Sequence, residues 1–248
     1  MPRIYQAISL KPQQQLELSN EAHQHLAKVL RAKVDDEINL FNGDGFDYPA
    51  QISAITKKST QVEVLAKQSN QLEADLDVHL LQAISRSDRM DFVVQKATEL
   101  GVKTITPVIS ERSNIKQKHE HLVKKQQHWQ KVAISACEQC GRSVVPEIKP
   151  VRTINELITA QLSGFVLVTP TANSLSDNIN HPQPHDNGIN LLVGPEGGLS
   201  PTEISKAINA GLKPLTLGPR VLRTETATIV GLAVLGMNFG DLNGKNSL

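Results

Sequence analysis

The sequence predicts two parts: a small β-barrel in residues 1–70 and a larger α/β domain with a largely parallel sheet in residues 71–248. Three observations lead to this prediction. Short strand-like segments follow one another closely in the first part, as in small barrels. From Val78 onward strand and helix patterns alternate, which is typical of α/β domains. Two of the late strand patterns end in glycine-containing loops, which are candidate ligand sites.

The composition is that of a folded and nearly neutral chain. The 26 Lys and Arg residues against 25 Asp and Glu leave a net charge of +1, and 39% of the residues are hydrophobic. These values exclude a disordered polyelectrolyte. No apolar run approaches the roughly eighteen residues of a membrane-spanning helix, and the first residues lack the layout of a secretory signal. We therefore expect a cytoplasmic protein with no membrane segment.

One helix and several short strands are expected in the first seventy residues. Ser19 and Asn20 form a plausible helix N-cap, and Asn42–Gly45 is a strong turn signal. The polar residues 67–77 read as a linker. Apolar residues follow the cap at helical spacing: Ala22, Leu26, Val29 and Leu30. The strand-like segments cover 37–41, 48–55 and 61–65.

The rest of the chain alternates between strands and helices. Gly101 is expected to end the first helix, and Thr153 with Glu156 forms a capping box that opens a later one. Residues 171–188 have no apolar period and predict an exposed loop. The predicted strands are 78–84, 104–109, 164–168, 189–193 and 214–217. The predicted helices lie around 90–100, over 119–140, and from Thr153, Pro201 and about Thr226.

The most informative segment runs from Leu191 to Ser200, where a buried strand pattern leads into Gly194-Pro195-Glu196-Gly197-Gly198. A helix is then expected to start with Ser200 as N-cap and Pro201 at its first position, and Glu203 completes a capping box with Ser200. Glycines let the backbone approach a ligand closely, at the carboxyl end of a strand where open sheets bind ligands. The segment is neither a P-loop nor a Rossmann fingerprint. A tight strand–helix connection without a ligand is the alternative.

A second segment, Leu215 to Ala227, repeats this arrangement and places two arginines and a carboxylate in the turn. Turns of this type usually carry Asp, Asn or Ser, so Arg220, Arg223 and Glu225 are candidate functional residues, although simple surface charges remain an alternative. Two such loops after neighbouring strands could form the two sides of one pocket.

The two loops together resemble the paired signature of the RsmE-like 16S ribosomal RNA uridine-N3 methyltransferases of the SPOUT class. Further similar segments occur in the same order along almost the whole chain: Pro2 to Tyr5, His25 to Arg31, Met90 to Gly101, Ser110 to Ser113 and Ala136 to Arg142. The resemblance implies a PUA-like barrel joined to an α/β domain with a deep trefoil knot, active as a homodimer. It also implies S-adenosylmethionine as cofactor and a uridine of the small ribosomal subunit as substrate.

Residue roles follow from the same resemblance. The cofactor-binding positions would be Thr169, Gly194, Pro195, Gly197, Leu217, Gly218 and Leu222. The imide N3–H of uracil is only weakly acidic, so its methylation needs a base or a stabiliser of the anion. Glu196 and Glu225 are the candidate bases, and Arg220 or Arg223 could stabilise negative charge on the uracil oxygens. Either glutamate could instead be a helix-start carboxylate favoured by the helix dipole.

Basic residues predict where RNA would bind. Between Arg112 and Lys131 lie six basic residues, three histidines and one glutamate, a strip that suits a phosphate backbone or merely solvates a helix. The resemblance adds positions in the first part and in the Cys137–Arg142 segment. The RNA-binding candidates are Arg3, Arg31, Arg112, Lys116, Lys124, Lys125, Gln139 and Arg142. Cys137 and Cys140 fall on a helix without a second pair, which favours structural cysteines, and no metal site is expected.

Two other functions remain open at this level. One is a SPOUT methyltransferase that acts on transfer RNA or on another ribosomal position. The other is a ribosome-assembly factor that keeps the fold without catalysis. Cofactor binding would separate the enzymes from the assembly factor, and the position of the modified nucleotide would separate the two enzymes.

Overall fold

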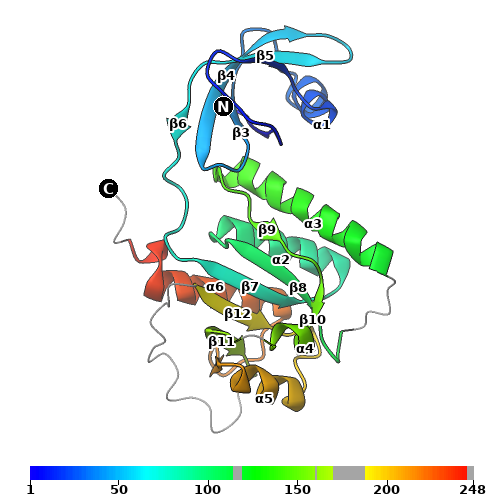
Figure 1. Cartoon of the computed structure of the whole chain (residues 1–248), viewed down its shortest axis with the longest axis vertical. Coiled ribbons are helices and arrows are strands. Elements are labelled where there is room, and N and C mark those ends of the chain that lie inside the picture. Colours follow the sequence, from blue (N-terminus) through cyan, green and yellow to red (C-terminus); the bar gives the residue numbers. More distant parts are fainter. Residues whose placement is uncertain (114–118, 160, 170–187, 245–248) are drawn as a thin grey trace. The chain divides into compact units, whose positions relative to one another are not determined.

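A computed structural model of the chain describes residues 1–113, 119–159, 161–169 and 188–244. The described residues form two compact units (Figure 1). Unit 1 comprises Met1–Glu73 and Ile134–Val145, and unit 2 comprises Ala74–Ala133 and Pro146–Leu248. The predicted boundary lies between residues 70 and 71, and residues 134–145 fall in the second of the two predicted parts. In the described ranges no helix is long and apolar enough to cross a membrane.

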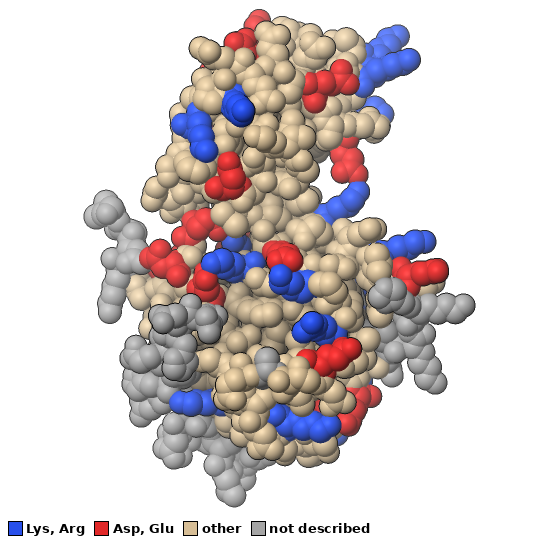
Figure 2. Space-filling view, in the orientation of Figure 1, with Lys and Arg blue, Asp and Glu red and all other residues tan. Residues whose placement is uncertain are grey.

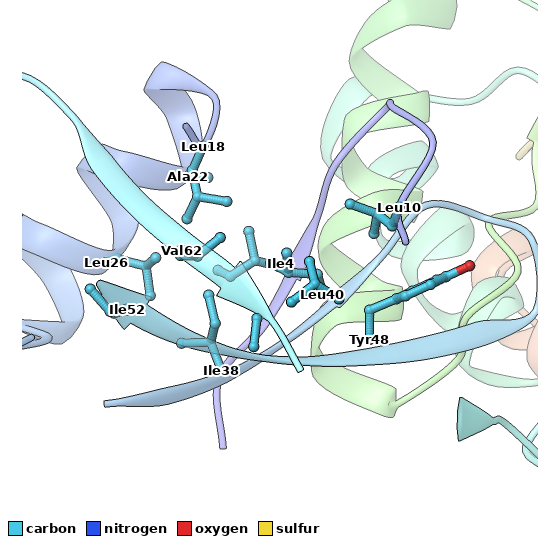
Figure 3. Packing of buried hydrophobic residues seen from close by; sticks show 12 residues of the cluster. Ile4, Leu10, Leu18, Ala22, Leu26, Ile38, Leu40, Tyr48, Ile52 and Val62 are labelled. Carbon is cyan, nitrogen blue, oxygen red and sulfur yellow. The ribbon is translucent and has the colours of Figure 1, made fainter. Parts of the chain in front are cut away.

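Unit 1 is built on a six-stranded sheet of order β1-β3-β4-β5-β2, with β6 paired to β4. Only the β1–β3 pair is parallel. Its core contains Ile4, Leu26, Ile38, Leu40 and Ile52 (Figure 3). The strands are β1 (Arg3–Tyr5), β2 (Gln15–Glu17), β3 (Glu37–Phe41), β4 (Phe46–Ile55), β5 (Thr60–Val64) and β6 (Gln68–Ser69). These confirm the three predicted strands, and β1, β2 and β6 are additional.

The helix of unit 1 differs from the predicted one in its second half. Ser19 caps α1 (Asn20–Gln24) by accepting a hydrogen bond from the Ala22 amide, as expected. The chain then winds as a π-helix, η1 (His25–Leu30), which ends at Arg31 with a left-handed φ of 52°. The wider turn changes the face on which later residues lie. Leu26 is fully buried, and Val29, expected on the same face, is turned away from it and is 68% exposed. Leu30, the last residue of η1, is 44% exposed.

Unit 2 is built on a seven-stranded parallel sheet, as predicted, of order β10-β8-β7-β12-β11-β13 with β9 paired to β8. Its strands are β7 (Val78–Ala83), β8 (Thr104–Ile109), β9 (Glu147–Ile148), β10 (Arg152–Thr153), β11 (Gly164–Leu167), β12 (Ile189–Val193) and β13 (Leu212–Leu215). Its helices are α2 (Ser87–Glu99), α4 (Ile154–Leu157), α5 (Pro201–Asn209), α6 (Thr224–Phe239) and the 3-10 turn η2 (Asp241–Asn243). The helix α3 (His119–Cys140) contributes residues to both units.

Local signals in unit 2 are mostly confirmed. Gly101 follows α2 with a φ of +82°, and both predicted capping boxes, at Thr153 and Ser200, are formed. One strand is displaced: the sequence predicts residues 214–217, but β13 covers Leu212–Leu215 because Leu212 pairs with Gly164 of β11. Pro214 is tolerated because β13 lies at the edge of the sheet. The displacement frees Leu217 from the sheet. The expected loop at 171–188 lies outside the described residues except for Gly188.

Candidate active site

A cavity of about 510 Å³ lies beyond the carboxyl ends of β11, β12 and β13 in unit 2. This is the edge at which parallel sheets bind ligands, and the volume is within the usual range for small-molecule sites. Both loops that the sequence singles out contribute to its wall. The predicted residues that line the cavity are Thr169, Gly194, Pro195, Glu196, Gly197, Leu217, Arg220, Leu222 and Arg223. Gly218 and Glu225 do not line it directly.

The loop after β12 is held in a tight conformation that only small residues allow. A Cβ atom on Gly194 would lie 2.9 Å from the backbone nitrogen of Leu199, so no side chain fits there. The Gly198 amide donates to the Pro195 carbonyl at 2.8 Å, and Gly198 has a φ of +67°. Gly194 and Gly198 therefore add no side chain to the cavity wall, and a ligand can approach the backbone closely at these two positions.

The connection after β8 packs against this loop through two side chains. Arg112 donates from Nη1 to the Gly197 carbonyl at 2.8 Å. Glu203, only 4% exposed, accepts from the Glu111 amide at 2.8 Å and from the Ser200 amide of its own capping box at 2.8 Å. Arg112, which the sequence analysis assigns to RNA binding, thus lines the cavity.

The loop after β13 carries the two predicted arginines. Gly218, with a φ of +81°, lies in the left-handed region that favours glycine. Arg220 and Arg223 follow it and are both exposed at the cavity. They place two positive charges beside a site that also has apolar walls, such as Leu167 and Ile204.

The two candidate bases have different surroundings. The Oε1 atom of Glu196 accepts from the Arg86 amide and from Nη1 of Arg89, each at 3.2 Å, and the Glu196 side chain is 34% exposed. Glu225 lies in the first turn of α6. Its Oε2 atom is buried and has no hydrogen-bond partner among the described residues. Arg89 was not predicted, and it lines the cavity together with Glu196.

A buried polar network behind the cavity was not predicted either. Gln82, at the end of β7, is fully buried and bonds to Thr224 and Thr228 of α6. Thr224 in turn donates to the Gly194 carbonyl at 2.7 Å. A glutamine within the otherwise apolar stretch Leu80 to Ile84 is the sequence signal that could have indicated it.

Of the remaining RNA-binding candidates, those in the described residues are not part of the cavity wall. Lys124 and Lys125 are on α3, where Lys124 is exposed and Lys125 half-buried, and Lys116 lies outside the described residues. Arg31 and Gln139 are exposed in unit 1. Figure 2 shows basic and acidic residues interspersed on the face that it presents, without a continuous basic field.

Arg3 and Arg142 are engaged inside unit 1. Arg3 makes a bidentate ion pair with Asp47 at 2.9 and 3.0 Å, and Arg142, 4% exposed, pairs with Glu73 at 2.8 Å. Burial would raise the pKa of Asp47, but hydrogen bonds from Arg3, Ser143 and other side chains lower it to about 2. These two guanidinium groups hold the fold of unit 1 together.

The cysteines are free thiols. Cys137 is fully buried and donates to the Val144 carbonyl at 3.6 Å. Burial raises the pKa of Cys137 to about 12, so this thiol remains protonated at neutral pH and unreactive. The prediction that the pair is structural agrees with this placement.

The cavity fits the cofactor that the sequence resemblance implies. S-adenosylmethionine combines an apolar adenine with polar ribose and amino-acid ends, and the cavity combines aliphatic walls with the backbone of a glycine loop. Open space at Gly198, where a Cβ atom would meet nothing within 4 Å, leaves that backbone accessible.

Comparisons with known proteins agree with this geometry. Residues 72–236 match the family described as RNA methyltransferase domain, and residues 18–65 match RNA methyltransferase PUA domain. Ribosomal RNA small subunit methyltransferase E of Buchnera aphidicola is 39% identical over 245 residues, 98% of each chain. A methyltransferase of Legionella pneumophila with bound SAM is 42% identical, with a TM-score of 0.89 over 97% of this chain and 98% of that one. Ribosomal RNA small subunit methyltransferase E from Neisseria gonorrhoeae, bound to S-adenosyl methionine, is 37% identical, with a TM-score of 0.87 over 97% and 99%.

Proposed function

This chain belongs to the RNA methyltransferase family that includes ribosomal RNA small subunit methyltransferase E, and we propose that it methylates N3 of a uridine in 16S ribosomal RNA. S-adenosylmethionine is the methyl donor, and the assembled small subunit in the cytoplasm is the substrate. One observation carries the proposal: the two loops that resemble the family signature line a single cavity of suitable size. Relatives similar over nearly the whole chain are known with the cofactor bound.

The cofactor is held by backbone and aliphatic side chains. We assign it to the loop Gly194–Gly197, to Thr169 after β11, and to Leu217, Gly218 and Leu222 after β13. When bound, it supplies an electrophilic methyl group on a sulfonium centre. The contribution of the chain is to hold the two reactants in line, and positioning of this kind can lower a barrier by roughly 7–11 kcal/mol.

The charged residues at the cavity prepare the uridine. Arg220 and Arg223 stabilise negative charge that develops on the uracil oxygens as N3 loses its proton, because preorganised cations are most effective where charge appears. Glu196 lines the cavity and is the first candidate to accept that proton. Glu225 follows Thr224 of the cavity wall but does not line the cavity itself. It is the second candidate, because its buried Oε2 atom has no hydrogen-bond partner among the described residues and can accept a proton.

The RNA contacts come from exposed positions. Lys124 and Lys125 on α3, with Arg31 and Gln139 in unit 1, are the candidates that remain accessible. Arg112 lines the cavity, and we keep it as a candidate RNA contact there. Arg3 and Arg142 are left out of this set, because carboxylates already engage their guanidinium groups.

The surface of α6 supports the proposal that the chain forms a homodimer. Gly231 faces the sheet, since a Cβ atom there would lie 3.2 Å from Leu191. Val230, Val234 and Met237 recur at i, i+4 and i+7, and Val230 and Met237 are 36% and 55% exposed. A helix with an exposed apolar stripe beside a buried one needs a second cover, and a second copy of this chain supplies it. Glutamate at Val230 and Met237 should give monomers in sedimentation experiments, and a variant that still forms dimers would contradict this interface.

The trefoil knot is proposed on the same family basis. The start of α6 bonds to the loop after β12 through Thr224 and Gly194, a contact between two late segments that is compatible with such a knot.

Methyl transfer onto unmodified small subunits tests the function. The purified chain is incubated with cofactor and subunits, and digestion with mass spectrometry locates the product. We expect a single N3-methyluridine in 16S RNA, and only in the presence of cofactor. A methylated transfer RNA, or cofactor binding without any methylated RNA, would contradict the proposal. As the control, subunits in which the methylated uridine is replaced by another nucleotide should not be methylated.

A further inference from the structure

The buried amide of Gln82 connects β7 to two segments that form the wall of the cavity. Gln82 does not line the cavity. Its Nε2 atom lies 3.1 Å from the Ala83 carbonyl and 3.2 Å from Oγ1 of Thr224, and its Oε1 atom accepts from Oγ1 of Thr228 at 2.7 Å. Thr224 lines the cavity and donates to the carbonyl of Gly194, which also lines it.

The chemistry of these groups determines the direction of each hydrogen bond. A carbonyl oxygen can only accept, so the amide group that faces Ala83 must be the NH₂ group. The same NH₂ group donates to Thr224, whose single hydroxyl proton is then free for Gly194. Thr228 has one hydroxyl proton too, which it shares between Gln82 and the Thr224 carbonyl at 2.9 Å. The chain of donors therefore runs from Gln82 through Thr224 to Gly194.

We propose that Gln82 is a positioning residue, which orients the Thr224 hydroxyl toward Gly194 and so holds the cofactor loop and the start of α6 in their binding-competent arrangement. This inference depends on the proposed function in that the cavity is taken to hold S-adenosylmethionine. A buried polar group without a hydrogen-bond partner lowers the stability of the folded state. The arrangement in which all of these groups are paired is therefore favoured over the others. The strand neighbours of Gln82, Pro107 of β8 and Val193 of β12, have no side-chain groups that could replace it.

Two substitutions at Gln82 separate orientation from packing. Gln82→Glu keeps the shape but replaces the donor with a second acceptor, which draws the Thr224 proton away from Gly194. Gln82→Met removes the polar atoms and leaves Thr224 able to donate to Gly194. If Gln82 orients the hydroxyl, the glutamate variant should weaken cofactor binding by tenfold or more, and the methionine variant by about threefold. If Gln82 only fills space, the isosteric glutamate variant should weaken cofactor binding less than the methionine variant.

Calorimetry with S-adenosylmethionine at pH 8.5 measures these affinities, and the wild-type chain is measured first. Absence of binding by the wild type would refute the proposed function, whereas equal binding by wild type and Gln82→Glu would overturn only the positioning role. Thr98→Val, which removes a buried hydroxyl from α2, controls for lost stability and should keep wild-type affinity. If the Gln82 variants do not fold, Thr228→Val and Thr228→Ser decide: we expect weakened binding for valine and recovery for serine, and equal affinities would overturn the proposal.

Discussion

Replacing Arg142 with methionine should destabilise unit 1 rather than only weaken RNA binding. The Arg142 side chain is 5% exposed, and its Nε and Nη2 atoms donate to Oε2 of Glu73 at 3.0 and 2.8 Å. Removing one partner of a buried ion pair costs about 3–5 kcal/mol, because the other charge remains without compensation. Glu73 is 27% exposed and keeps the amides of Ser143 and Val144, so we expect the lower end, about 3 kcal/mol.

Urea unfolding of the full chain, followed by circular dichroism and by hydrogen exchange in residues 1–73, measures this loss. The double variant Arg142→Met with Glu73→Gln should lose less stability than the sum of the two single variants, because it leaves no unpaired charge. Arg31→Met is the matched control: Arg31 is exposed in the same unit, so stability should change by less than about 0.5 kcal/mol while RNA affinity falls. An Arg142→Met variant as stable as wild type but deficient in RNA binding would refute the structural role.

Three further predictions follow from the same structure. Gly197→Val should raise the cofactor dissociation constant at least about tenfold. A Cβ atom at this position of the cavity wall would lie 3.4 Å from Cβ of Arg112, so the bulk of a valine would displace Arg112 or the loop. Unchanged calorimetric affinity in a folded variant would exclude this loop from the site. The pKa of Asp47 is lowered from 3.8 to about 2. Its stabilisation of about 2 kcal/mol is therefore fully present above about pH 5 and is lost as the pH falls toward 2. Asp47→Asn should abolish this part of the acid dependence, and an unaltered unfolding profile would contradict it. Changing Lys124 and Lys125 to glutamine should weaken subunit binding and flatten its salt dependence, whereas a wild-type slope would mean that these lysines only solvate α3.

Local sequence signals account for most of the secondary structure. Capping boxes at Thr153 and Ser200, the glycine after α2 and the apolar periods of the strands depend on residues within a few positions of each other, and the structure contains them as predicted. The signals failed where the chain departed from regular geometry. The π-helix η1 rotated Val29 out of the core, and pairing with β11 displaced β13 by two residues.

The candidate site was accessible to sequence reasoning only in part. The two loops could be located because glycine, proline and paired arginines in a strand–helix turn are unusual enough to indicate a ligand. Their convergence on one cavity depends on the order of β11, β12 and β13 in the sheet, which no local pattern encodes. The resemblance to a known family supplied what periodicity could not, above all the identity of the cofactor.

The sequence by itself determined most of the helices and strands, the two loops and the family, because each of these is encoded by neighbouring residues or by a recurring motif. Only the tertiary structure decided what the charged and buried polar residues do. Arg3 lies 140 residues from Ser143 and bonds to it, Gln82 lies 142 residues from Thr224, and Arg112 meets Gly197 across 85 residues. An arginine can form a buried ion pair, line a cavity or bind RNA, and the sequence alone does not distinguish these roles. The role depends on the partner that folding brings close to it.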